Sequence, residues 1–130
     1  MANPLTYFER YTMVKAVLVG EGVADDAFSV VPFPINIPEL YRYYVPMEAV
    51  FLITICDTWG ERKHELLTGQ GLHVEVMWRR TPDTKGLTGA EIRRRMLCSE
   101  PWEDLVPPST ASLLLTWKIV DRLRDLSRTP

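Results

Sequence analysis

The sequence predicts an α/β fold in which helices flank a parallel sheet. Its 130 residues, 46% hydrophobic and 25% charged, have the size and composition of one globular domain. Short apolar runs alternate along the chain with segments of helical spacing, the pattern of a parallel sheet with helical crossovers. The run at residues 50–55 is continuously apolar, which is typical of a strand covered on both faces. We therefore expect one domain over residues 1–130.

Three of the predicted helices begin with the pattern Thr-x-x-Glu, at residues 6–9, 58–61 and 88–91. In a capping box the threonine oxygen accepts from the backbone N–H three residues on, and the glutamate reaches back. The pattern predicts helices over about 6–19, 61–67 and 89–98. A fourth helix is predicted from Ser109 to about Leu126, because apolar residues recur there at helical spacing.

The predicted strands are the β-branched runs at residues 28–31, 50–55 and 73–78. Four prolines follow residues 28–31 in a segment that connects two predicted strands. A proline there does not interrupt the hydrogen bonds of a central strand. No repeat or low-complexity tract divides the chain.

Composition excludes several classes of protein. No run approaches the roughly 20 apolar residues of a membrane span, and the first four residues do not resemble a signal sequence. Cys56 and Cys98 have no Cys-x-x-Cys spacing, which favours free thiols in a cytoplasmic protein. His64 and His73 lack the spacing of metal ligands, so no protein-held metal is expected. The net charge of −2 argues against a nucleic-acid partner.

One short segment is strongly basic. Residues 79–95 hold six basic and two acidic side chains, against five basic and ten acidic in residues 1–78. Such a cationic segment attracts small anions, although a solvated loop explains the charge equally well. The predicted helix at Thr88 adds unpaired N–H groups that bind anions. Gly89 has no side chain to block an anion from these N–H groups, and Arg93 lies one turn further along the predicted helix. We therefore interpret Thr88, Gly89 and Arg93 as a phosphate site.

These residues resemble a known signature. Gly-Leu-Thr-Gly-Ala-Glu-Ile-Arg-Arg-Arg-Met-Leu at 86–97, followed by Pro-Trp-Glu-Asp-Leu-Val-Pro at 101–107, is similar to the C-terminal motif of the archaeal-type nicotinamide or nicotinate mononucleotide adenylyltransferases. These enzymes belong to the nucleotidylyltransferase superfamily. Asn-Pro-Leu-Thr at 3–6 with Glu9-Arg10 is similar to a second segment of that family. The resemblance covers nearly the whole chain and is weakest over residues 36–78.

The resemblance implies a Rossmann-like fold and transfer of an AMP or CMP-like group from a nucleoside triphosphate to a phosphate acceptor, in the manner of NAD biosynthesis. Arg93 would bind the triphosphate, Thr88 would stand at the family's serine, and Mg²⁺ would accompany ATP. Asp57 and Trp59 lie where the family contacts the nicotinate or adenine of its ligands. Alternatively, Asp57 caps the second helix and Trp59 packs behind it.

Two departures from the family qualify this expectation. Ala90 replaces a threonine of the phosphate motif. The family's His-x-Gly-His signature is also absent from this sequence, so we expect the fold to lack the first β-α unit that carries it. We then expect a second copy or a complementary subunit to cover the exposed sheet, and no turnover by this chain alone. The alternative function is a non-catalytic module that binds a nucleotide or phosphate.

Overall fold

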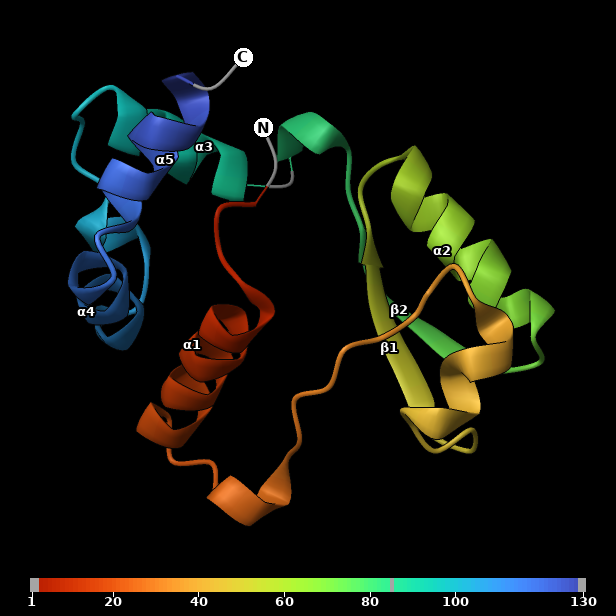
Figure 1. Ribbon diagram of the computed structural model, residues 1–130. Helices are drawn as coiled ribbons and strands as arrows, with labels where there is room; N and C mark the ends of the chain where they lie inside the picture. Colours follow the sequence, from red (N-terminus) through yellow and green to blue (C-terminus); the bar gives the residue numbers. More distant parts are fainter. Residues whose placement is uncertain (1–2, 85, 129–130) are drawn as a thin grey trace. The chain divides into compact units, whose positions relative to one another are not determined.

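The computed structural model describes residues 3–84 and 86–128 and confirms the α/β class. Its elements are the helices α1 (Tyr7–Gly20), α2 (Thr58–Gly69), α3 (Gly89–Leu97), α4 (Pro108–Thr116) and α5 (Ile119–Arg128), and the strands β1 (Val50–Ile55) and β2 (His73–Arg79) (Figure 1). Short 3-10 helices lie at Asp25–Ala27, Pro38–Tyr43, Pro82–Thr84 and Glu103–Leu105. Among the described residues, no helix has the length and apolar character needed to cross a membrane.

The chain forms two compact units. One unit combines the segment up to Val31 with the segment from Leu87 onward, and the other is the segment Pro32–Gly86 between them. Each unit has its own hydrophobic cluster.

The unit Pro32–Gly86 is a strand-helix-strand motif. β1 and β2 pair in parallel, from Val50 opposite His73 to Ile55 opposite Arg79, with one irregularity after Ile53. α2 packs on one face of this sheet (Figure 1). The buried cluster comprises Tyr41, Ile53, Ile55, Leu67 and Leu72. On β1 and β2, Leu52 and Met77 keep 59% and 63% of their surface exposed, so apolar side chains of this sheet reach solvent.

The other unit is helical, and it carries the predicted phosphate motif. α1 packs on α4, and α5 packs on both α3 and α4 (Figure 1). The buried residues of the cluster are Met96, Trp102, Leu114, Ile119 and Leu123.

The predicted helix starts at Thr6 and Thr88 are confirmed, whereas the predicted start and cap of the second helix are wrong. At α1 the full capping box forms between Thr6 and Glu9. At α2 the cap is Asp57 rather than Thr58, since its carboxylate accepts from the Gly60 N–H at 2.8 Å. The helix therefore begins three residues before Glu61. Gly60 allows this start, because a Cβ there would lie 3.2 Å from the Ile55 Cα.

The predicted strand at residues 28–31 is wrong. This segment has no strand partner in the described chain and leads into Pro32 and Pro34. Its Val30 carbonyl accepts instead from the Tyr7 hydroxyl at 3.2 Å. A strand forms only where a neighbouring strand completes its backbone hydrogen bonds. The composition of residues 28–31 suits a strand, but it does not make one without such a neighbour.

The single helix predicted from Ser109 to Leu126 is also wrong, because the structure has two helices there. Lys118 adopts a left-handed backbone with φ of 54° and ends the helical ladder after Thr116. The break turns α5 back onto α3 and α4, so that Ile119 and Leu123 join the buried cluster with Leu114. Tertiary burial thus overrides the continuous helical pattern.

Candidate anion-binding site

The N-terminus of α3 is built as the sequence predicts. Thr88 is extended, and its hydroxyl oxygen accepts from the Glu91 N–H at 3.1 Å. Gly89, the first helical residue, is exposed. The remaining N–H groups of the first turn have no helical carbonyl partner, so this end of the helix is suited to a negative charge.

Arg93 lies directly over this helix start. Its side chain runs back toward Gly89, where an added Cβ would meet the Arg93 Nη1 at 3.1 Å. Arg93 is half-buried, and its guanidinium forms no ion pair with any residue of the described chain. A glycine at position 89 therefore leaves room for a guanidinium beside the free backbone N–H groups.

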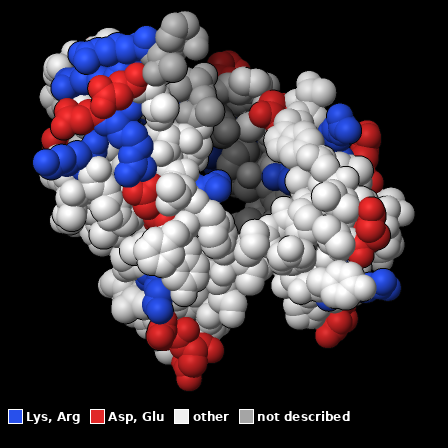
Figure 2. All heavy atoms as spheres, in the orientation of Figure 1, with Lys and Arg blue, Asp and Glu red and all other residues white. Residues whose placement is uncertain are grey.

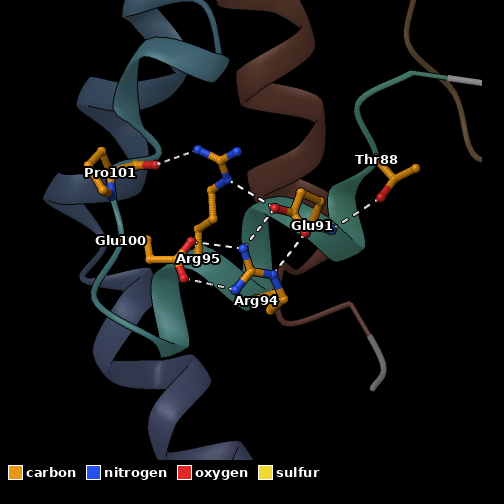
Figure 3. A network of polar contacts seen from close by, with 6 residues as sticks. All are labelled: Thr88, Glu91, Arg94, Arg95, Glu100 and Pro101. Carbon is orange, nitrogen blue, oxygen red and sulfur yellow. Dashed lines mark hydrogen bonds and ion pairs between the residues drawn. The ribbon is translucent and has the colours of Figure 1, made fainter.

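The two following arginines have carboxylate or carbonyl partners (Figure 3). Arg94 binds Glu91 at 2.9 Å and Glu100 at 2.8 Å, and Arg95 binds Glu91 at 3.1 Å and the Pro101 carbonyl at 3.3 Å. The hydrogen bonds from Arg94 and Arg95 lower the pKa of the Glu91 carboxyl to about 2. The Glu91 side chain therefore binds these two arginines and does not complete a capping box.

Ion pairs offset much of the positive charge of the basic segment at residues 79–95. Arg79 pairs with Glu61, and Arg94 and Arg95 are neutralised by Glu91 and Glu100. Figure 2 shows basic and acidic side chains interleaved over α3 and α5. Lys85 lies outside the described residues. The segment is therefore less cationic in the fold than in the sequence.

A cavity of about 240 Å³ opens beside Arg93. Most of its lining is apolar, contributed by Leu5, Met13, Ile92, Met96, Val106, Leu114 and Ile119, with Asn3, Thr110 and Gly89 as polar or backbone contributors. Arg93 thus stands between an apolar hollow and the N–H groups of α3.

A partly buried ion pair holds the Asn3–Leu5 wall of this cavity. Arg122 of α5 donates to both carboxylate oxygens of Glu9, at 2.7 and 2.9 Å, and to the Pro4 carbonyl at 3.1 Å. The hydrogen bonds from Arg122 and from the Thr6 backbone lower the pKa of Glu9 to about 2. One carboxylate therefore joins the N-terminal segment, α1 and α5.

Comparison with known proteins identifies the chain's relatives. It is 40% identical over 123 residues to phosphonoformate cytidylyltransferase of Streptomyces viridochromogenes, covering 95% of this chain and 66% of the relative. It is 33% identical over 136 residues to nicotinamide-nucleotide adenylyltransferase of Pyrococcus horikoshii, and 34% identical over 128 residues to that of Pyrococcus abyssi. Each of these last two matches covers 98% of this chain and 67% of the relative.

The chain belongs to the nucleotidylyltransferase superfamily. It spans about two-thirds of the length of the relatives it matches. No protein-family model matches it, and no solved structure matches it significantly.

Within this nucleotidylyltransferase-family chain, the five predicted site residues fall into two groups. Thr88, Gly89 and Arg93 meet at the start of α3. Asp57 and Trp59 lie at the start of α2 in the other unit. Asp57 serves as the helix cap, and Trp59 is 45% exposed. The roles of all five residues toward a ligand remain predictions.

Sequence reasoning missed the ion pair between Glu9 and Arg122 beside this site. Glu9 lies in a quoted family-like segment, but its partner Arg122 stands 113 positions away, and no local pattern links the two. His73 lies 3.6 Å from Glu75 on the exposed side of β2. No group of three metal-binding side chains occurs among residues 3–84 and 86–128.

Proposed function

We propose that this chain forms the triphosphate-binding part of a nucleotidylyltransferase that acts on a small anionic acceptor. In that reaction an acceptor oxygen attacks the α-phosphorus of a nucleoside triphosphate. The new P–O bond forms as the bond to the β-phosphate breaks, and pyrophosphate leaves. Such chemistry depends on alignment of the phosphates and on stabilising their charge.

Arg93, which has no ion-pair partner in the part of the chain that the structure describes, carries this proposal from its place beside the open start of α3. A guanidinium, backbone N–H groups and the Thr88 hydroxyl converge there. These are the donors that a triphosphate tail requires. Mg²⁺ would arrive with the triphosphate as part of the substrate, since the described residues offer no cluster of metal ligands.

The choice of nucleotide is part of the proposal. The cytidylyltransferase relative, at 40% identity, supports CTP with a small phosphonate acceptor. The adenylyltransferase relatives, at 33–34% identity, support ATP with a mononucleotide, as in NAD biosynthesis. We favour the first pair because of the higher identity.

Calorimetry of the full chain with MgCTP and with MgATP tests the proposal. We expect one of the two to bind, and Arg93→Ala to weaken that binding at least tenfold, since a charge-assisted hydrogen bond contributes about 1.5–3 kcal/mol. Arg128→Ala, which removes an equal charge from an exposed position on α5, is the matched control. No binding of either nucleotide, or equal effects of the two variants, would refute the site.

A second candidate, a nucleotide-binding module without activity, is favoured by Ala90, which stands at a threonine of the family's phosphate motif. Pyrophosphate release separates the two functions. The assay combines MgCTP with phosphonoformate, and MgATP with nicotinamide mononucleotide. Release that depends on the acceptor establishes the enzyme, whereas nucleotide binding without release supports the module.

A further inference from the structure

A groove along α1 adjoins the cavity beside Arg93. The groove has a volume of about 300 Å³ and is lined by Met13, Val14, Val17, Leu18, Pro107 and Thr110. Met13 and Thr110 also line the cavity of about 240 Å³, so the two spaces meet at these side chains. Every residue that lines them belongs to the helical unit. The cavity and the groove therefore form one largely apolar site within a single unit.

The charge of this site is confined to one end. Among the described residues that line the cavity or the groove, Arg93 is the one that carries a charge, and it lines only the cavity. Its guanidinium has no ion-pair partner in the described chain. A guanidinium beside free backbone N–H groups binds a carboxylate or another anionic head group. An anion held there has an apolar surface next to it.

The volume and the lining fit an alkyl chain. An apolar cavity of about 150 Å³ is large enough to bind benzene, and the cavity and the groove together exceed this volume. The groove extends along α1 from Met13 to Leu18, which is more than one helical turn. Val14 keeps 45% of its surface exposed there. A linear chain covers apolar surface in both spaces, whereas a single small ring fills only one.

We propose that the cavity and the groove bind an alkyl chain whose anionic head is held by Arg93. The ligand is a free single-chain carboxylic acid of medium length. Charge complementarity selects this occupant, because one cation stands at one end of an apolar surface. The site does not depend on the proposed nucleotidyl transfer. It does require that the acid and a nucleoside triphosphate compete, since both use Arg93.

The test is an NMR titration of the full chain, isotopically labelled at its methionine methyl groups, with octanoate below its critical micelle concentration. Met13 and Met96 line the cavity, and Met13→Leu and Met96→Leu assign their signals. Met47 and Met77 are exposed side chains of the other unit and serve as internal controls. We expect saturable shifts of the Met13 and Met96 signals with one Kd, and no shift of the two controls at that concentration.

Two comparisons separate the contribution of the head from that of the chain. Octanol lacks the charge and should bind about tenfold more weakly than octanoate, and Arg93→Ala should weaken octanoate by about the same factor. Arg10→Ala removes an exposed cation of α1 that lines neither space and should leave the Kd unchanged. From butanoate to octanoate, the affinity should rise about two- to fourfold for each methylene.

Substitutions in the lining test the path of the chain. Val14→Glu places a charge in the groove and should weaken octanoate by about fivefold or more. Val19→Glu is the matched control, because Val19 is 47% exposed on the same helix and lines neither space. Thr110→Val removes a hydroxyl that an alkyl chain cannot hydrogen-bond, so octanoate should bind this variant at least as tightly as the wild type.

Three results would overturn the inference. The first is the absence of a saturable shift at Met13 in the wild type. The second is equal affinity of Arg93→Ala and the wild type for octanoate. The third is an equal effect of Val14→Glu and Val19→Glu, since the groove then takes no part in binding.

Other occupants give different signals. Shifts of Met47 and Met77 with the same Kd would mean general adsorption to apolar surfaces, and a Met13 signal that moves with protein concentration would assign the groove to a second copy. Either result also overturns the inference. Octanoate should raise the apparent Kd of MgCTP, and MgCTP binding that octanoate does not affect would contradict the shared use of Arg93. If MgCTP does not bind at all, the triphosphate site fails while the octanoate titration still decides the alkyl site.

Discussion

At the scale of single residues, Glu9 has several structural roles. Its carboxylate completes the capping box of α1 and accepts two hydrogen bonds from Arg122, which also binds the Pro4 carbonyl. The Glu9 side chain is only 11% exposed, so water cannot easily replace the two hydrogen bonds that Arg122 donates to it. The wall of the cavity beside Arg93 therefore depends on this pair.

We expect Glu9→Gln to lower the free energy of unfolding by about 2 kcal/mol at pH 7, because it leaves the Arg122 charge without its carboxylate. In the wild type the pKa of Glu9 falls from its ordinary value of 4.5 to about 2 on folding. The ionised carboxylate thus stabilises the fold fully above about pH 4.5, and this contribution is lost as the pH falls toward 2.

Urea denaturation at pH 7, 4.5 and 3 measures this effect. The stability difference between the wild type and Glu9→Gln should be greatest at pH 7 and should shrink at pH 3. A difference that stays constant over this range would contradict the assigned pKa. Glu103→Gln, an exposed carboxylate in a 3-10 helix, provides the control.

At the scale of elements, local signals predicted more than long-range ones did. The helix starts at Thr6 and Thr88 were predictable because a cap depends on residues three positions apart. The meeting of Thr88, Gly89 and Arg93 followed from the same short spacing. Residues 28–31 do not form a strand because no partner strand lies beside them in the described chain, and such a long-range pairing is not visible in a local pattern. The pairing of Arg93's neighbours with Glu91 and Glu100 depends on rotamers, which a sequence pattern does not specify.

The two interpretations of Asp57 can be separated by substitution. Asparagine caps a helix about as well as aspartate, whereas alanine loses about 1 kcal/mol. We expect Asp57→Ala to lower the free energy of unfolding by about that amount and Asp57→Asn to leave it unchanged. If Asp57 also contacts a substrate, Asp57→Asn will weaken binding in calorimetry while stability is retained. Unchanged binding would restrict Asp57 to its role as the cap.

The turn between α4 and α5 offers a stabilising change. Lys118 has a φ of 54°, a conformation that costs non-glycine residues about 1 kcal/mol. Lys118→Gly removes this strain, although it adds freedom to the unfolded chain. We expect a net gain of up to about 1 kcal/mol in thermal or urea unfolding. Lys118→Ala keeps the strain and should show no gain, and equal stability of the two variants would contradict the explanation.

At the scale of the whole molecule, the two hydrophobic clusters predict partly independent stability. Leu123 is fully buried in one cluster and Leu67 is 2% exposed in the other. Truncating either leucine to alanine should cost about 2–5 kcal/mol. In amide hydrogen exchange, we expect Leu123→Ala to reduce protection in α3, α4 and α5 while β1 and β2 keep theirs. Leu67→Ala should do the reverse. Equal losses throughout would show that residues 1–130 respond as one cooperative domain.

The connectivity of the helical unit has a consequence for synthesis on the ribosome. α1 is translated early, but its packing partner α4 and the Arg122 of α5 emerge last among the described elements. Arg122 lies 113 positions after its partner Glu9. The intervening segment Pro32–Gly86 has therefore been translated before Arg122 is added to the chain. Contacts so distant in sequence form slowly, since a long loop must close first. Among the described elements, those that form the candidate anion-binding site are therefore the last to mature, and a ribosome that stalls before α5 leaves α1 without its anchor.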